Sequence, residues 1–275
     1  MNIANFNWKS YLTKIQRQSY AVIGLLSFAL LSIGAGGVWF YLDKKEASEE
    51  SERLKKQQEL AAKIKKVNDY YKDILDGASP EKVVDIIVAV SQSSLPVKLA
   101  GFSLDSYKCD LSTCAFSFLS QDGKIFNIQD LYFHGDYYKP NISPKGVEYQ
   151  IKSSPLKSDD LHKRFEARES IDTENCGELI NYVRSFNSLM TDKKFQLNLS
   201  GYPASSIESI ENVIPEVKNK YALKSVKWNA ILDNDILAVT AFLKRQAYSE
   251  SFRINKIEKK KSSGIEISGN LICTI

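Results

Sequence analysis

The sequence predicts an α+β protein carried by one N-terminal transmembrane helix that continues into a helical stalk. Three observations predict this order. An uncharged apolar run occupies residues 20–42, and residues 43–75 are rich in Glu, Lys and Ala without any Gly or Pro. The rest of the chain mixes helical and strand-like patterns. Hydrophobic residues make up 43% of the chain and charged residues 25%, which is typical of a folded globular body.

The apolar run reads YAVIGLLSFALLSIGAGGVWFYL. A helix of this length spans roughly 34 Å at about 1.5 Å per residue, which is enough for a hydrocarbon core about 30 Å thick. Aromatic residues stand at both ends, as expected at membrane interfaces. The preceding tail, residues 1–19, is basic, so the positive-inside rule places it in the cytoplasm. Its charged residues are Lys9, Lys14 and Arg17.

A cleaved signal peptide is the alternative, because small residues surround Gly36. The apolar core of a signal peptide is usually about 7–15 residues long, and this run continues through bulky residues, so the pattern favours a retained anchor. Ser32 and Gly36 have the small-xxx-small spacing that lets membrane helices pack closely.

The stalk covers residues 43–77 and carries one apolar stripe at helical spacing. Its members are Leu60, Ile64, Val67, Tyr71 and Ile74. Two interpretations stay open. The stripe either forms a coiled coil with a partner, or it belongs to a solvated spacer helix whose last turns pack on the domain below.

The first part of the body covers residues 78–160. Ser79 and Pro80 suit the cap and first position of a helix, which we expect over residues 81–92. After Pro96 the pattern becomes strand-like. The expected strands are residues 97–109, 114–120, 123–133 and 146–153.

The second part covers residues 161–275. We expect helices over residues 176–190 and 205–220, the latter interrupted at Pro215. The expected strands are residues 195–203, 223–232, 236–245, and a hairpin of 251–259 with 264–275. Two small ferredoxin-like α+β domains would account for this order, and a single larger mixed domain is the alternative.

Cys109 and Cys114 flank a turn-like segment between two predicted strands, so a disulfide between them would fix the register of the hairpin. Such a short loop stabilises by only about 2 kcal/mol in the chain-entropy model. The expected topology places both residues in an oxidising compartment. Cys176 and Cys273 are a second, more weakly supported pair, since both could be buried thiols. Zinc is the competing use, but no C-x₂-C spacing occurs.

No sequence pattern for catalysis is present. The chain lacks a phosphate-binding loop, a G-x-S-x-G elbow and an H-E-x-x-H pair. It contains only two histidines, His134 and His162. We therefore expect no catalytic, cofactor-binding or metal-binding residues and no enzymatic activity. The net charge of +4 is too small, and too concentrated in the tail, to indicate a nucleic-acid binder.

Residues 98–126 read KLAGFSLDSYKCDLSTCAFSFLSQDGKIF, in which a close cysteine pair follows one strand and precedes an apolar strand. This segment resembles the type IVb PilO-like inner-membrane assembly proteins of bacterial type IV pili. The closing GIEISGNLICTI resembles their final strand at Ser268 and Gly269. The layout of tail, membrane helix, stalk and small domains is similar as well. Many of these proteins carry a large cytoplasmic domain, where this sequence has a short tail.

The resemblance implies a non-enzymatic structural component of the inner-membrane assembly platform of a type IVb pilus, without cofactors. It implies a single-pass topology with a cytoplasmic N-terminus and a periplasmic body. The implied partners are other inner-membrane pilus assembly proteins and a secretin or its lipoprotein, in a homo- or hetero-oligomer. Membership of a type II secretion-like system is an alternative. A periplasmic sensor or regulator is another, although the tail leaves little room for an output domain.

Overall fold

The computed structural model describes residues 44–45, 48–121, 128–158, 160–190, 193–214, 222–260 and 264–274. The expected cytoplasmic tail and transmembrane helix lie outside these ranges, as do Ser32 and Gly36. Among the described residues, no helix combines the length and the apolar character needed to cross a membrane.

The chain divides into two units, Met1–Lys63 and Ile64–Ile275. The first unit contributes helical residues 48–63, which are all exposed. Helical residues 64–75 belong to the second unit. The expected helical character of the stalk is therefore confirmed over residues 48–75.

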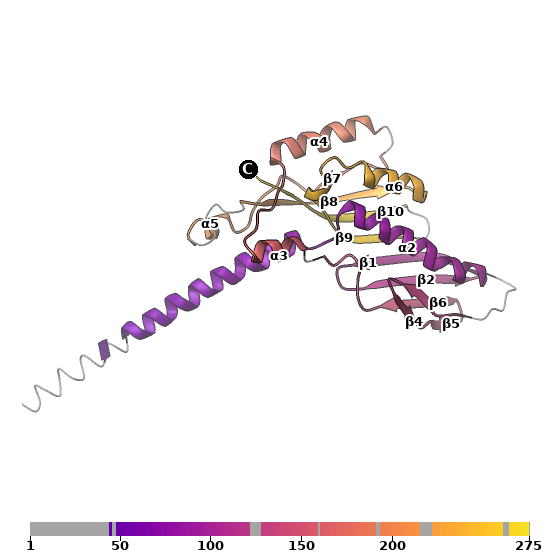
Figure 1. Cartoon of the computed structure of the whole chain (residues 1–275), viewed down its shortest axis with the longest axis horizontal. Coiled ribbons are helices and arrows are strands. Elements are labelled where there is room, and N and C mark those ends of the chain that lie inside the picture. Colours follow the sequence, from indigo (N-terminus) through magenta and orange to yellow (C-terminus); the bar gives the residue numbers. More distant parts are fainter. Residues whose placement is uncertain are drawn as a thin grey trace, which may run out of the picture. The chain divides into compact units, whose positions relative to one another are not determined.

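The second unit is built on an eight-stranded antiparallel sheet with the order β5-β6-β2-β1-β9-β10-β8-β7 (Figure 1). Its strands are β1 (Phe102–Asp110), β2 (Cys114–Ser120), β5 (Asn141–Ser143), β6 (Gly146–Ile151), β7 (Asn198–Leu199), β8 (Lys224–Leu232), β9 (Phe252–Lys259) and β10 (Ile265–Cys273). A separate hairpin consists of β3 (Leu131–Phe133) and β4 (Asp136–Tyr138).

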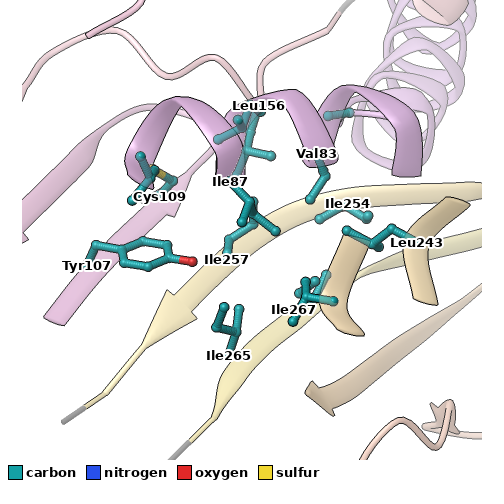
Figure 2. Packing of buried hydrophobic residues seen from close by; sticks show 14 of the residues in the cluster. Val83, Ile87, Tyr107, Cys109, Leu156, Leu243, Ile254, Ile257, Ile265 and Ile267 are labelled. Atoms are coloured by element: carbon teal, nitrogen blue, oxygen red, sulfur yellow. The ribbon is translucent and has the colours of Figure 1, made fainter. Parts of the chain in front are cut away.

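Three longer helices pack on one face of this sheet. They are α2 (Pro80–Leu99), α4 (Cys176–Leu189) and α6 (Ile236–Lys244). Strand β8 shows the consequence, since Trp228 and Ala230 are buried whereas Lys227 and Asn229 between them are exposed. The main core lies between these helices and the sheet (Figure 2). Short helices are α3 (Asp160–Glu166), α5 (Glu208–Glu211) and the 3-10 turn η1 (Ser249–Ser251).

The two predicted domains form a single sheet. Strand β1 from the first part of the body pairs with β9 from the second, in a register that places Tyr107 opposite Lys259. Residues Ile64–Ile275 form one compact unit. The α+β class is confirmed. All strand pairs in the sheet are antiparallel. Strands β8 and β9 are joined by α6 and lie on either side of β10, which is the strand order of a split β-α-β unit.

Two expectations about local structure are wrong. Residues 236–245 were expected as a strand but form α6, because the Asp235 side chain caps the helix by accepting a hydrogen bond from the Leu237 N–H. Its buried residues, Val239, Phe242 and Leu243, have helical spacing. Helix α2 also continues through Pro96 to Leu99, where a strand was expected, because the buried Val97 extends the apolar face of the helix by one more turn.

Three other elements are shorter than expected, one of which is the strand over residues 123–133, described only as β3. The strand over residues 195–203 is reduced to β7, and the helix over residues 205–220 is described only as α5. Residues 215–221, including Pro215, lie outside the described ranges.

Candidate functional site at the base of the long helix

The apolar stripe of the stalk enters a second core of the body. Val67, Tyr71 and Ile74 are each at most 2% exposed, whereas Leu60 is 45% exposed and Ile64 is partly buried. The three buried side chains pack with residues in or next to α3, α5, β8 and β10. Those residues are Leu161, Phe165, Ile171, Ile207, Ile214, Leu223 and Ile272. Val67, Tyr71 and Ile74 therefore pack inside their own chain, as in the second of the two interpretations of the stalk, in which its last turns pack on the domain.

Polar contacts fix the end of this helix to the sheet. Asn270 of β10 donates a hydrogen bond from Nδ2 to the Asp73 carbonyl oxygen at 3.0 Å. Arg253 of β9 donates one from Nη2 to the Gly77 carbonyl oxygen. We call Tyr71, Asp73, Gly77, Arg253 and Asn270 the helix junction. Because both donors lie on central strands, the last turn and the following residues are attached directly to the middle of the sheet.

The backbone adds a second attachment. Ala78 and Ile254 exchange two hydrogen bonds, of 2.9 Å and 2.8 Å. Gly77 has a φ of +123°, and a Cβ atom there would lie 2.8 Å from the Ile254 carbonyl oxygen. Only glycine combines this conformation with such a close approach. The sequence signal of a helix break at Gly77 therefore has a structural reason.

Arg253 is 4% exposed and brings a positive charge into the junction. Burial lowers the pKa of its guanidinium, while the carboxylates of Glu250, Asp160 and Asp76 oppose this shift. The Asp76 carboxylate also accepts hydrogen bonds from the N–H groups of Gly77 and Ser158, at 2.8 Å and 3.2 Å. The junction is therefore a buried polar network, in which each removed partner leaves another group unsatisfied.

Two tyrosines of the helix form further hydrogen bonds with the body. Tyr71 donates a 2.5 Å hydrogen bond to the Glu211 carboxylate, which is only 6% exposed. Burial raises the pKa of Glu211 above its ordinary value, and the hydrogen bond from Tyr71 offsets part of that rise. Tyr70 donates to the carbonyl oxygens of Ala204 and Leu223, at 3.2 Å and 3.4 Å.

The structure contains both expected disulfides. Cys109 and Cys114 lie opposite each other at the end of the β1–β2 hairpin and are joined there. The turn between them is ordered by Asp110, whose carboxylate accepts hydrogen bonds from Ser112 and Thr113. Burial alone would raise the pKa of Asp110, but these hydrogen bonds outweigh it and lower the pKa.

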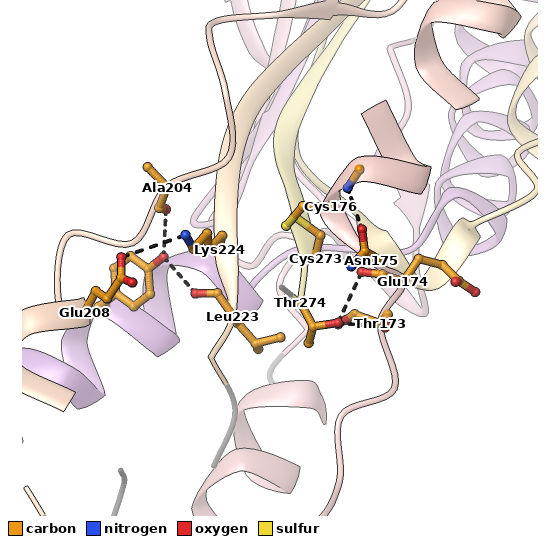
Figure 3. Close-up of a disulfide and its surroundings, with 12 residues drawn as sticks. Thr173, Glu174, Asn175, Cys176, Ala204, Glu208, Leu223, Lys224, Cys273 and Thr274 are labelled. Atoms are coloured by element: carbon orange, nitrogen blue, oxygen red, sulfur yellow. Dashed lines mark hydrogen bonds and ion pairs between the residues drawn. A yellow bond between two sulfur atoms is a disulfide. The ribbon is translucent and has the colours of Figure 1, made fainter. Parts of the chain in front are cut away.

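Cys176 and Cys273 join the start of α4 to the end of β10 across 97 positions of sequence (Figure 3). Asn175 caps α4 by accepting a hydrogen bond from the Gly177 N–H. Thr274 and Glu174 form a backbone hydrogen bond of 2.9 Å beside the bridge. This disulfide therefore ties a helix of the covering layer to the same strand that carries Asn270.

The described residues contain no group of His, Cys, Asp and Glu side chains arranged to hold a metal ion. His134 lies in the β3–β4 turn, and His162 on α3 is 3.6 Å from Glu166. The helix junction is thus suited to holding a helix at a fixed position. Sequence reasoning missed Arg253, Asn270 and Glu211, which carry no local pattern.

Comparison with known proteins adds no relative: no family model, curated protein or solved structure matches the chain.

Proposed function

We propose that this protein is a non-enzymatic structural component of the inner-membrane assembly platform of a bacterial type IVb pilus. In this proposal, residues 20–42 anchor the chain with its N-terminus in the cytoplasm and its body in the periplasm. The body positions other inner-membrane pilus assembly proteins, and a secretin or its lipoprotein, within a homo- or hetero-oligomer.

The observation that carries the proposal is the helix junction. A protein that aligns partners across a compartment needs its supporting helix fixed to its folded body. Here the last turns of the helix are buried by Val67, Tyr71 and Ile74, and the chain just beyond them is bonded to central strands by Arg253 and Asn270. A flexible Gly- or Ser-rich linker would leave the body free to reorient.

The two disulfides support the periplasmic location. Structural disulfides form and persist in oxidising compartments such as the bacterial periplasm. The cysteines of both bridges lie on helices and strands that form the main core. Cys109, Cys114 and Cys273 are fully buried. Membership of a type II secretion-like system rests on the same features and is distinguished by the proteins that associate with the chain.

The proposal is tested by deleting the gene in the bacterium that encodes the chain and counting surface pili by electron microscopy. We expect loss of pili and restoration by the wild-type gene. A Lys55→Pro variant should fail to restore pili, because proline interrupts the exposed helix at this position.

Lys55→Ala is the matched control, since it removes the same side chain but keeps the helix. Immunoblotting must show equal amounts of both variants. Normal piliation of the deletion strain would contradict the proposed function, and full restoration by Lys55→Pro would contradict the role of a continuous helix.

A further inference from the structure

A small hollow lies on the helical side of the sheet. It opens between the second half of α2 and the start of α6, and β1, β9 and β10 contribute its floor. Its apolar lining includes Val90, Leu104, Ile236 and Ile265. We call it the α2–α6 hollow.

The hydroxyl group of Tyr107 is the first feature of the hollow that is suited to binding a ligand. Tyr107 is 4% exposed and lines the hollow, with its oxygen directed away from β1 and between the α2 and β10 side chains (Figure 2). No described residue forms a hydrogen bond with this hydroxyl group. A buried donor without a partner costs free energy, so an acceptor that enters the hollow would remove that cost.

Two lysines give the second sign. Lys98 of α2 and Lys259 of β9 both line the hollow, and within the described part of the chain neither forms an ion pair. Their charges are close enough to interact: burial, and then repulsion from Lys98, lower the pKa of Lys259. Two acidic groups of the loop before α6 have other partners, since Asp233 pairs with Lys194 at 3.7 Å and Asp235 caps α6.

Size and surroundings indicate what kind of ligand fits. The hollow has a volume of about 50 Å³, enough for a few water molecules or one carboxylate but far below the several hundred Å³ of a small-molecule pocket. On both helices, leucines that are adjacent in sequence to lining residues are exposed. Leu95 is 54% exposed, Leu99 77% and Leu237 79%.

We propose that the α2–α6 hollow is a docking site for an acidic side chain of a partner protein, presented next to an apolar residue. The carboxylate lies between Lys98 and Lys259 and accepts a hydrogen bond from Tyr107, while the adjacent apolar residue covers Leu95 and Leu237. Charge complementarity selects the acidic group, and the exposed leucines select a protein segment over a free anion. This inference does not depend on the pilus proposal.

The test uses the purified full chain with isotope-labelled tyrosine rings, and the Tyr107 resonance is assigned with Tyr107→Phe. The probe is N-acetyl-Leu-Glu-amide, compared with N-acetyl-Leu-Gln-amide, which has the same shape without the charge. We expect the Glu peptide to shift the Tyr107 resonance saturably and the Gln peptide to bind about tenfold more weakly. Lys98→Met and Lys259→Met should each weaken Glu-peptide binding about threefold.

Lys82→Met is the matched control, because Lys82 lies on the same helix but near His134, on the flank of α2 away from the hollow. It should leave binding unchanged. Unshifted resonances of the other tyrosines show that each variant is folded. Three results would overturn the inference: equal binding of both peptides, equal shifts with sodium acetate alone, or equal weakening by Lys82→Met.

Discussion

Arg253 and Gly77 are separated by 176 positions in sequence, and the guanidinium of the first donates a hydrogen bond to the carbonyl oxygen of the second. The contact joins β9, in the middle of the sheet, to the glycine that ends the long helix. Since Ala78 also pairs with Ile254, two consecutive residues after the helix are bonded to two consecutive residues of β9. The attachment of helix to sheet therefore depends on a few identifiable groups.

Removing the Arg253 side chain should destabilise the body. Arg253→Ala leaves the buried Gly77 carbonyl without its donor and opens a cavity, so we expect a loss of roughly 3 kcal/mol in the free energy of unfolding. Urea unfolding of the full chain measures it. Arg245→Ala removes an exposed arginine at the end of α6 and should change stability by less than about 0.5 kcal/mol. Equal effects of the two substitutions would contradict the junction.

Gly77→Ala tests the close approach of the backbone. The added Cβ meets the Ile254 carbonyl oxygen at 2.8 Å in a left-handed conformation, so we expect a loss of about 2 kcal/mol or more. The control is Gly201→Ala, where nothing lies within 4 Å of an added Cβ. Thermal unfolding should show a lower melting temperature for Gly77→Ala alone. An unchanged value would mean that the Gly77 conformation is not required.

The two disulfides should differ in their contribution to stability. In the chain-entropy model, closing a loop of about 100 residues contributes roughly 4.5 kcal/mol, and a loop of about five residues roughly 2 kcal/mol. The pair Cys176→Ala/Cys273→Ala should therefore lose more stability than Cys109→Ala/Cys114→Ala. Urea unfolding compares the two double variants. Alkylation and mass spectrometry of the unreduced exported protein checks the bridges directly, and a free Cys109 or Cys273 would refute the corresponding bridge.

Glu211 should make stability fall with rising pH. Its pKa is raised in the folded protein above the ordinary value of 4.5, chiefly by burial. The folded state thus binds the proton more tightly than the unfolded chain. This stabilising contribution is complete below the unfolded pKa and is lost as pH rises through the folded pKa. Glu211→Gln should remove this dependence, whereas the exposed Glu148→Gln should preserve it. Unfolding curves recorded from below pH 4.5 upward test both variants. If stability depends on pH as steeply in Glu211→Gln as in the wild type, Glu211 is not the group responsible.

Local signals in the sequence predicted much of the fold. The cap formed by Ser79 and Pro80 marked the start of α2, and the hairpin of β9 and β10 lies where two strand-like segments were expected, at residues 251–259 and 264–275. The Cys109–Cys114 bridge followed from two strands around a short turn. In each case the determining residues are close in sequence.

The remaining features depend on contacts between distant residues. Segment 236–244 is apolar and rich in β-branched residues, so its pattern does not separate helix from strand; burial of Val239 and Phe242 against the sheet decides. The pairing of β1 with β9 joins strands more than a hundred positions apart. Likewise, nothing near Arg253 or Asn270 in sequence indicates that their side chains meet the end of the long helix.

The most direct test of the proposed function is co-purification of the affinity-tagged full chain from detergent-solubilised membranes of its own bacterium, followed by mass spectrometry. The proposal predicts that inner-membrane pilus assembly proteins are recovered with the wild-type chain and are lost with Lys55→Pro at equal expression. Recovery of type II secretion proteins instead would support that alternative. Recovery of neither group from cells that are assembling pili would contradict the proposal.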